Sequence, residues 1–166
     1  MADDDDAGRA AVDLNIREAE AKDIPAVIGL DTRITGISKP DYWTDMFERY
    51  GMRPNRFFLV AMGEGEKLAG FIIGEVRAWE FGSAPSGWVF ALGVDSEVRL
   101  NKIGTRLFEA ICRRLAECGV DTVRTMLARD DELNMVFFRS LGMMGGPFIQ
   151  LEMPLDEFTT NAELEK

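Results

Sequence analysis

The sequence contains no histidine and only two cysteines. The absence of histidine excludes every histidine-based catalytic triad and every metal site built on imidazole. Cys112 and Cys118 fall on one expected helix at positions that face different sides, so they cannot pair with each other. Two cysteines without further ligands form no zinc site. We therefore predict no metal site and a reduced, cytoplasmic setting.

Long hydrophobic runs are also missing. No apolar segment approaches the ~20 residues that a helix needs to cross a bilayer, and the first residues are acidic and lack the hydrophobic region of a secretory signal. The formal net charge of −10 argues against nucleic acid as a partner. We expect neither a membrane nor a nucleic-acid partner, and we leave the oligomeric state open, with a dimer as one option.

Length and composition favour a single folded domain. A chain of 166 residues with 46% hydrophobic and 10% aromatic residues is typical of a globular protein. The run of four aspartates that begins at Asp3 predicts a disordered acidic tail over residues 1–12. Residues 13–157 are expected to form the domain, and residues 158–166 a polar C-terminal tail.

Hydrophobic periodicity and turn residues predict an alternation of strands and helices. A strand–helix–strand unit around Cys112 implies one parallel pair in a sheet that is otherwise antiparallel. The result is an α+β fold with a mixed, twisted sheet and helices on both faces. The expected strands are residues 14–17, 56–62, 68–76, 88–94, 122–128 and 148–153. The expected helices are residues 24–33, with Asp23 as N-cap, residues 41–50, a helix that begins at Ile103 and stops before Gly119, and residues 132–141, capped by Asp130 or Asp131.

The stretch after the fourth strand is basic in an acidic protein. Its helix carries Ile103, Leu107, Ile111 and Leu115 at four-residue spacing, so one face is apolar. A helix entered from a strand end presents unpaired N–H groups, which suit a phosphate or pyrophosphate. The alternative is an ordinary strand-to-helix turn with surface cations, which are Arg99, Lys102, Arg106, Arg113 and Arg114.

The same stretch resembles the acyl-CoA signature of the GNAT superfamily of N-acetyltransferases, Arg/Gln-x-x-Gly-x-Gly/Ala. Here Leu92-Gly93-Val94 ends the strand, and the loop runs Arg99-Leu100-Asn101-Lys102-Ile103-Gly104. Arg99 and Gly104 match, but Lys102 replaces the first glycine, so the backbone there is expected to avoid positive φ. The order of elements also resembles the GNAT fold from about Leu14 to Glu157, which implies a sheet of six to seven strands.

The resemblance implies acetyl-CoA as the cofactor. The strands that diverge after Val94 would open a slot for the pantetheine arm, which would pair with the backbone of the strand end. The N–H groups that begin the helix would hold the pyrophosphate. The implied cofactor-binding residues are Leu92, Gly93, Val94, Arg99, Leu100, Asn101, Lys102, Ile103, Gly104, Thr105, Asp131 and Phe138.

A second family segment, Asn-(x)6-Tyr-(x)3-Gly-Phe, corresponds to Asp131, Phe138, Gly142 and Met143. In relatives the tyrosine often protonates the departing thiolate, which Phe138 cannot do. Three alternatives follow: a water molecule or another group protonates the sulfur, the thiolate leaves unprotonated, or catalysis is slow. Phe138 would still wall the cofactor, unless it is an ordinary core residue.

Acetyl transfer to an amine requires a base or a desolvating pocket, because a lysine-like amine has a pKa of ~10.4 and is protonated at neutral pH. Many relatives place a glutamate on the strand equivalent to residues 88–94, and this sequence has none there. The catalytic candidates are Glu75, which lies in an apolar run, and Glu80, which lies near the sheet end. The alternatives are an outward-facing strand residue for Glu75 and a solvated loop charge for Glu80.

The predicted function is acetyl-CoA-dependent transfer of an acetyl group to a primary amine. Because the negative net charge attracts cations, we expect a cationic small-molecule or protein acceptor: a protein lysine or N-terminus, a polyamine or an amino-sugar. Asp31 and Tyr42 are the expected substrate-binding residues, although core packing explains Tyr42 equally well. The rival is a catalytically weak or inactive acyl-CoA-binding sensor module of the same fold, which Phe138 and the missing strand glutamate favour.

Overall fold

The computed structural model describes residues 14–97 and 102–156. The chain forms two compact units, Met1–Ala128 and Arg129–Lys166. The tails predicted over residues 1–12 and 158–166 lie outside the described residues.

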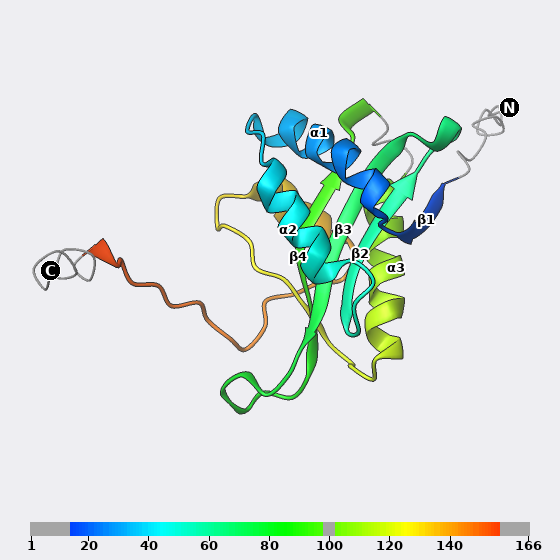
Figure 1. Cartoon of the computed structure of the whole chain (residues 1–166). Helices are drawn as coiled ribbons and strands as arrows, with labels where there is room; N and C mark the ends of the chain where they lie inside the picture. Colours follow the sequence, from blue (N-terminus) through cyan, green and yellow to red (C-terminus); the bar gives the residue numbers. More distant parts are fainter. Residues whose placement is uncertain (1–13, 98–101, 157–166) are drawn as a thin grey trace, which may run out of the picture. The chain divides into compact units, whose positions relative to one another are not determined.

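The first unit contains a five-stranded sheet in the order β1-β2-β3-β4-β5 (Figure 1). The first four strands pair with antiparallel neighbours, and the last pairs parallel to β4, which confirms a mixed sheet. The strands are β1 (Asn15–Glu18), β2 (Arg56–Met62), β3 (Leu68–Arg77), β4 (Ser86–Val94) and β5 (Val123–Arg124).

The expectation of six to seven strands was wrong. The strand expected over residues 122–128 is reduced to β5, and residues 148–153 form no strand. Alternating apolar residues make a strand only where a neighbouring backbone completes the ladder of hydrogen bonds. Residues 125–128 run on without such pairing, and residues 148–153 have no such neighbour in the described part of the chain.

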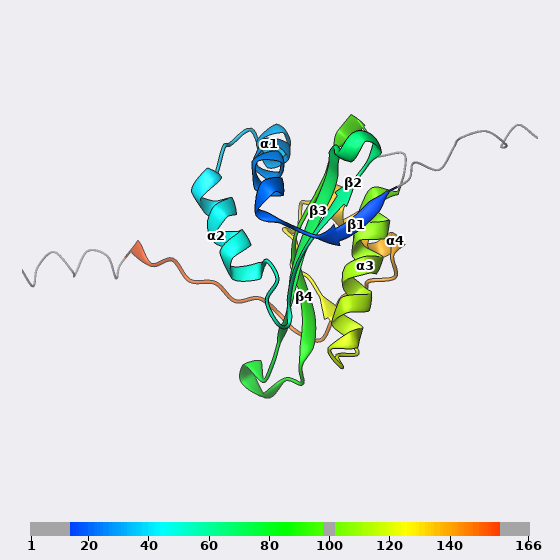
Figure 2. The same cartoon turned by 45° about the vertical axis from the view of Figure 1, so that its right-hand side comes forward.

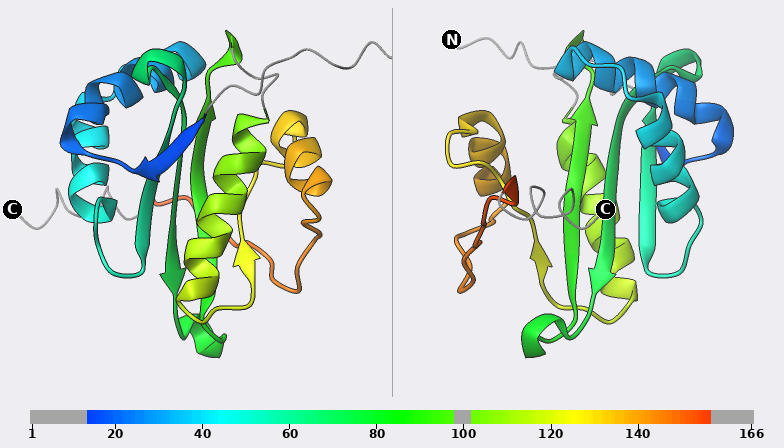
Figure 3. Two further views of the ribbon diagram at one scale, coloured as in Figure 1. Left: turned by 90° about the vertical axis from the view of Figure 1, so that its right-hand side faces the viewer. Right: turned by 60° about the vertical axis from the view of Figure 1, so that its left-hand side comes forward.

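Helices cover both faces of the sheet, as predicted (Figures 2 and 3). Helices α1 (Ile24–Thr35) and α2 (Pro40–Tyr50) lie on one face, and α3 (Ile103–Glu117) lies on the other. The four-residue spacing in α3 has the expected effect, because Ile103, Leu107, Ile111 and Leu115 are all buried.

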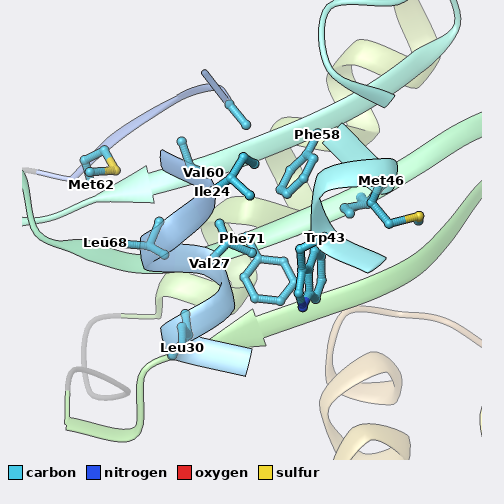
Figure 4. Packing of buried hydrophobic residues seen from close by; sticks show 12 residues of the cluster. Ile24, Val27, Leu30, Trp43, Met46, Phe58, Val60, Met62, Leu68 and Phe71 are labelled. Atoms are coloured by element: carbon cyan, nitrogen blue, oxygen red, sulfur yellow. The ribbon is translucent and has the colours of Figure 1, made fainter. Parts of the chain in front are cut away.

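The core on the α1/α2 face is rich in aromatic rings (Figure 4). The Trp43 ring meets Phe71 edge-on with centroids 4.9 Å apart and also approaches Phe58. The indole Nε1 of Trp43 donates to Asp31 Oδ2 at 2.9 Å, which satisfies both buried groups. Trp43 of α2 is therefore a core residue.

Glycines in the sheet let α3 approach closely on the other face. A Cβ at Gly74 would lie 2.6 Å from the Trp88 carbonyl oxygen and 2.9 Å from Ile111 Cδ1. A Cβ at Gly87 would lie 2.6 Å from Leu115 Cδ1. This close packing sets the position of α3, and hence of its N-terminus, relative to the end of β4.

The helix boundaries follow local signals with one exception. Gly36 ends α1 with φ of 75°, as expected of a left-handed cap. Asp23, expected to cap α1, already has helical dihedrals because it closes a 3-10 turn, Ala21–Asp23. Its carboxylate instead accepts from Arg17 at 2.7 and 2.9 Å and from the backbone N–H of Glu20 at 2.8 Å. Asp23 therefore ties β1 to the start of the helices.

The second unit contains α4 (Glu132–Ser140). Asp131 is its N-cap, as predicted, and accepts from the Asn134 backbone N–H at 3.2 Å. Gly142 follows the helix with φ of 90°. In the first unit Cys112 and Cys118 are both free, as expected. None of the helices in the described part of the chain is long and apolar enough to cross a membrane.

Candidate functional site

The pairing of β3 with β4 contains a bulge. Ile73 pairs with Ala91, but the next residue, Gly74, pairs with Val89, so Phe90 is an extra residue on β4. Its side chain is exposed at 37%. A bulge bends its strand and redirects the side chains around it, and bulges are common beside active sites.

Strands β4 and β5 separate close to this bulge. They pair only through Gly87 with Val123 and Trp88 with Arg124. Beyond Trp88, the outer edge of β4 over residues 89–94 has no partner strand among the described residues. We call this segment the open β4 edge; it includes Leu92, Gly93 and Val94. An extended ligand can add to such an edge through backbone hydrogen bonds.

The opening begins earlier than expected. The sequence analysis placed the divergence after Val94, whereas pairing with β5 already ends at Trp88. The reason is the register of the parallel pair: β5 starts beside Gly87, near the beginning of β4, and is only two residues long. The register between strands so far apart in the chain has no local signature.

The N-terminus of α3 offers free backbone donors. Its first internal bond runs from the Arg106 N–H to the Lys102 carbonyl at 3.0 Å. The N–H groups of Ile103, Gly104 and Thr105 therefore have no acceptor within the helix. Together with the helix dipole, such groups bind phosphate well.

Lys102 contradicts one expectation directly. Its φ of 53° and ψ of 33° are left-handed, although we expected a lysine there to avoid positive φ. This conformation is uncommon outside glycine and is associated with functional sites. It lets the chain turn into α3 while Ile103, which is 1% exposed, fills the contact between helix and sheet.

The basic residues near this helix have different roles. Arg106 Nη2 donates to the Leu14 carbonyl at 3.0 Å and so ties α3 to the start of the sheet. Arg113 pairs with Glu109. Lys102 is exposed beside the free N–H groups of the helix. The loop residues Arg99, Leu100 and Asn101 lie outside the described residues.

These features fit the cofactor that the sequence suggested. The open β4 edge can pair with the amide groups of a pantetheine arm, and the start of α3 can hold a pyrophosphate. Asp131 and Phe138 belong to the second unit. The Asp131 carboxylate bonds within α4, to Asn134, and the Phe138 ring meets Phe137 edge-on. A cofactor role for these two residues stays a prediction.

Glu75 lies on the α1/α2 face beside the bulge, opposite Trp88 on β4 and Arg56 on β2. Its Oε1 is 2.9 Å from Arg77 Nε, and its Oε2 is 3.8 Å from Arg56 Nε. The side chain is only 14% exposed. It is therefore a paired, mostly buried carboxylate, and its catalytic role stays a prediction.

The two arginines that pair with this carboxylate stack on aromatic rings. The Tyr50 ring meets Phe90, the bulge residue, with centroids 5.1 Å apart. The guanidinium of Arg56 lies over the Tyr50 ring at 5.4 Å, and that of Arg77 lies over the Trp88 ring at 4.6 Å. Burial, followed by the negative charge of Glu75, raises the pKa of Tyr50 above its ordinary value. We call this group the Glu75 cluster: Tyr50, Arg56, Glu75, Arg77, Trp88 and Phe90.

Glu75 is the one member of this cluster that the sequence pattern predicts as a site residue. Alternation along β3 could have placed Arg77 on the same face as Glu75. Arg56 reaches Glu75 from β2, and its guanidinium also lies over the Tyr50 ring of α2; only the strand register and the packing of α2 bring these groups together. Phe90 joins the cluster because of the bulge, which has no signal in the sequence.

The other predicted site residues lie elsewhere. Glu80 is exposed in a short turn, Glu80–Gly82, beyond the paired ends of β3 and β4 (Figure 1). Asp31 is buried and bonds Lys39 Nζ at 2.9 Å as well as Trp43. Tyr42 is 44% exposed and packs on Trp43. Catalysis by Glu80 and substrate binding by Asp31 and Tyr42 stay predictions.

An open strand edge, a bulge and a helix N-terminus at the strand end together define a protein that binds an acyl-CoA-like donor. The chain belongs to the acetyltransferase (GNAT) family, whose model matches residues 24–143. Proteins of this family use acetyl-CoA as the acetyl donor. No curated protein sequence matches the chain significantly.

Several solved structures share the fold. The aminoglycoside N-acetyltransferase AAC(6')-Iy in complex with CoA is 16% identical, with a TM-score of 0.76 over 87% of this chain and 97% of that chain. AAC(6')-Ih from Acinetobacter baumannii is 14% identical, with a TM-score of 0.73 over 85% and 98%. The BH1408 protein from Bacillus halodurans is 22% identical, with a TM-score of 0.70 over 85% and 99%. At these identities the similarity establishes a shared fold.

Proposed function

We propose that this protein is an acetyl-CoA-dependent N-acetyltransferase that moves the acetyl group to a primary amine of a cationic acceptor. The observation that carries this proposal is the open β4 edge over residues 89–94, which contains the bulge and precedes α3 in the chain. A backbone edge and a helix N-terminus match the two chemically distinct parts of the donor, the amide-containing arm and the pyrophosphate.

Acetyl-CoA, when bound, supplies an activated thioester. The backbone of the open β4 edge positions it, and one of the N–H groups of that edge stabilises the oxyanion that forms on acyl transfer. The N–H groups of Ile103, Gly104 and Thr105 hold the pyrophosphate, and the exposed ammonium of Lys102 adds positive charge. Arg99, Leu100 and Asn101 complete this part of the proposal from the sequence pattern.

On the acceptor side, Glu75 is the better of the two proposed bases. It lies opposite Trp88, where β4 leaves β5, whereas Glu80 lies in the turn beyond the strand ends. The attacking amine must lose a proton before or during the transfer, and a carboxylate at this position accepts it directly or through a water molecule. Phe138 has no hydroxyl with which to protonate the thiolate.

The acceptor class follows from the charge of the protein and from the structures that share its fold. Two of these are named aminoglycoside acetyltransferases, whose acceptors are amines. The net charge of −10 attracts cations over the whole surface. A polyamine, an amino-sugar, a protein lysine or an N-terminal amine satisfies both observations.

A release assay for the CoA thiol tests the proposal, with lysine peptides, polyamines and aminoglycosides as acceptors at low and high salt. We expect turnover, with an apparent affinity that falls as salt rises because exposed charges are screened. Glu75→Gln should lower kcat by about 100-fold, within the usual range for general-base catalysis. The matched variant Glu80→Gln should lower it much less, and the reverse ranking would assign the base to Glu80.

The same assay separates the enzyme from the rival sensor module, which the phenylalanine at position 138 favours. A sensor would show a higher Tm with acetyl-CoA, since ligand binding stabilises the folded form, but no thiol release with any amine. The absence of a Tm shift at millimolar acetyl-CoA would contradict both functions.

A further inference from the structure

The turn between β3 and β4 carries two exposed aromatic side chains. Residues 78–85 lie beyond the last pair of these strands, Arg77 with Ser86, and project past the end of α3 (Figures 1 and 2). At the tip, Trp79 is exposed at 71% and Phe81 at 111%, so neither ring packs against the fold. Large aromatic rings stabilise a protein when they are buried, and rings held out in this way indicate a surface that binds a partner.

The backbone of the turn holds both rings outward in a defined conformation. Trp79, Phe81 and Gly82 are all left-handed, with φ of 60°, 47° and 79°. The Gly82 N–H donates to the Trp79 carbonyl at 3.2 Å, and the Ser83 N–H donates to the Glu80 carbonyl at 2.9 Å. Left-handed backbone costs energy at residues other than glycine and is found at functional sites. The turn therefore presents the two rings in a preset orientation, which reduces the entropy lost on binding.

The position of the turn on β4 places it on the acceptor side of Glu75. In the proposed function the donor occupies the open β4 edge and the start of α3, which follow Trp88 in the chain. The turn precedes Trp88, which pairs with Glu75, and so lies at the other end of β4. Trp79 is four residues beyond Glu75, which is up to ~13 Å of extended chain. An acceptor with its amine at Glu75 can therefore extend to the tip on the side away from the donor.

The charge at the tip favours a cationic partner. Glu80 lies between the two aromatic residues and is exposed. It forms no ion pair with another described residue, whereas Glu75 is paired with Arg56 and Arg77. A carboxylate between two rings suits a cationic side chain next to an apolar one, because the cation can pair with the carboxylate and lie over a ring. A polypeptide supplies both groups from neighbouring residues, and it covers more of the two rings than a polyamine or a single amino-sugar does.

We propose that the Trp79–Phe81 turn docks a cationic polypeptide acceptor, by binding residues about four positions from the lysine or N-terminal amine that is acetylated. The spacing follows from the ~3.3 Å that each extended residue spans between Glu75 and the tip. This inference rests on the proposed function and selects a polypeptide among the acceptors named there. Because docking takes place away from the reacting atoms, it acts on KM for the acceptor and not on the chemical step.

Kinetics with a matched pair of peptides test the docking. Both peptides have one lysine and a blocked N-terminus; an Arg-Leu pair stands four residues from the lysine in the first and directly beside it in the second. We expect KM to be about 5-fold lower for the first peptide, as for one exposed cation–π contact. Trp79→Ala should abolish this difference by raising the KM of the first peptide, with kcat, KM for acetyl-CoA and Tm unchanged. Equal KM values for the two peptides in the wild type, or a difference that persists in Trp79→Ala, would overturn the proposal.

Met52→Ala is the matched control variant. Met52 is exposed at 77% and is also left-handed, with φ of 51°, but it lies in the turn between α2 and β2. We expect the KM values for both peptides to equal those of the wild type. If Met52→Ala abolished the difference as well, the peptide would be binding to exposed apolar side chains in general, and the assignment to the Trp79–Phe81 turn would be wrong.

Tryptophan fluorescence tests binding without relying on turnover. Trp79 is exposed and Trp43 is buried, so a peptide without aromatic residues that covers the tip should shift the emission of Trp79 to shorter wavelength. The shift should be absent in Trp79→Phe. A shift without acetylation of any amine would contradict the proposed function and support docking, whereas acetylation without a shift would support the function and contradict docking. A shift with phosphatidylcholine vesicles but not with the peptide would assign the turn to a lipid surface and likewise contradict docking.

Discussion

The open β4 edge and the Glu75 cluster share the bulge at Phe90 but are built differently. The edge and the start of α3 offer backbone groups: the outer edge of residues 89–94, which has no partner strand among the described residues, and the N–H groups of residues 103–105, which have no acceptor within the helix. The cluster offers side chains, with one carboxylate held by two arginines. In the proposed function, one region recognises the donor through strand and helix geometry, and the other recognises the acceptor through the identity of particular residues.

This difference explains how the two regions tolerate sequence change. Lys102 occupies a position where the family pattern has glycine, and the helix start still forms because the backbone adopts the left-handed conformation. The Glu75 cluster has no such freedom, since each member satisfies or stacks on another. The contrast predicts that backbone geometry limits the donor side, while single functional groups limit the acceptor side.

The largest expected effect comes from disturbing the backbone at the bulge. In Gly74→Ala the new Cβ would lie 2.6 Å from the Trp88 carbonyl oxygen, so β4 or α3 must shift. We expect the free energy of unfolding to fall by about 2–3 kcal/mol, as for other overpacked cores. Urea denaturation measures this change. Gly63→Ala is the matched control, because its Cβ would meet atoms no closer than 3.7 Å; equal stabilities of the two variants would contradict the packing account.

A smaller loss of stability is expected from substitution of Asp31, which acts through its side chain. Asp31→Ala leaves the buried Trp43 Nε1 without its acceptor and breaks the pair with Lys39, which should cost about 2 kcal/mol. Asp31→Asn keeps an acceptor for Trp43 and should cost less. Thermal and urea unfolding measure both. If instead KM for the amine rises in Asp31→Asn while stability is unchanged, Asp31 binds substrate and the structural role is secondary.

Asp95 connects the end of β4 with α1, and it should make the free energy of unfolding depend on pH in the acid range. It lies at the end of β4 and accepts from the Glu97 N–H and from Arg33 of α1, both at 3.0 Å. These bonds, that from Glu97 first and that from Arg33 next, hold the pKa of Asp95 below its ordinary value of 3.8 against the opposing effect of burial. A lowered carboxyl pKa stabilises the fold above the ordinary value, and this stabilisation is lost as pH falls through the folded value.

The variant Asp95→Asn isolates this contribution. At pH 7 its free energy of unfolding should be about 1 kcal/mol lower than that of the wild type. This difference in the free energy of unfolding should shrink as the pH is lowered from 5 toward 2. Urea midpoints across this range measure it. A gap that stays constant with pH would show that the charge of Asp95 does not matter.

The smallest effect is expected at Lys102, where charge and backbone can be separated. Lys102→Glu should weaken acetyl-CoA binding about 5-fold at low salt and less at high salt, since the side chain is exposed and screened. Lys102→Gly removes the charge but suits the left-handed φ of 53°. Its affinity for acetyl-CoA should fall by roughly 2-fold, which is about half of the 5-fold effect on a logarithmic scale, because one unit of charge is lost instead of two. Calorimetric titration measures both. A larger loss in the glycine variant would show that a fixed backbone matters more than charge.

The helical part of the fold could be predicted from the sequence because its signals are local. The spacing of Ile103, Leu107, Ile111 and Leu115 placed the buried face of α3, and Gly36 placed the end of α1. The motif around Leu92, Gly93, Val94 and Gly104 predicts the donor side for the same reason, since it consists of one continuous segment of chain. Residues adjacent in sequence determine periodicity, caps and helix N-termini.

Only the tertiary structure decided the acceptor side and the edges of the sheet. The Phe90 bulge and the separation of β4 from β5 after Trp88 depend on strand register, which is set by contacts between distant segments. Tyr50 joins the cluster because α2 packs over the sheet and brings its ring under Arg56, and Lys102 adopts a left-handed conformation just before the buried Ile103. Long-range packing overrode local preference at each of these positions, because burying apolar side chains outweighs the small cost of an unfavourable backbone or an unpaired edge.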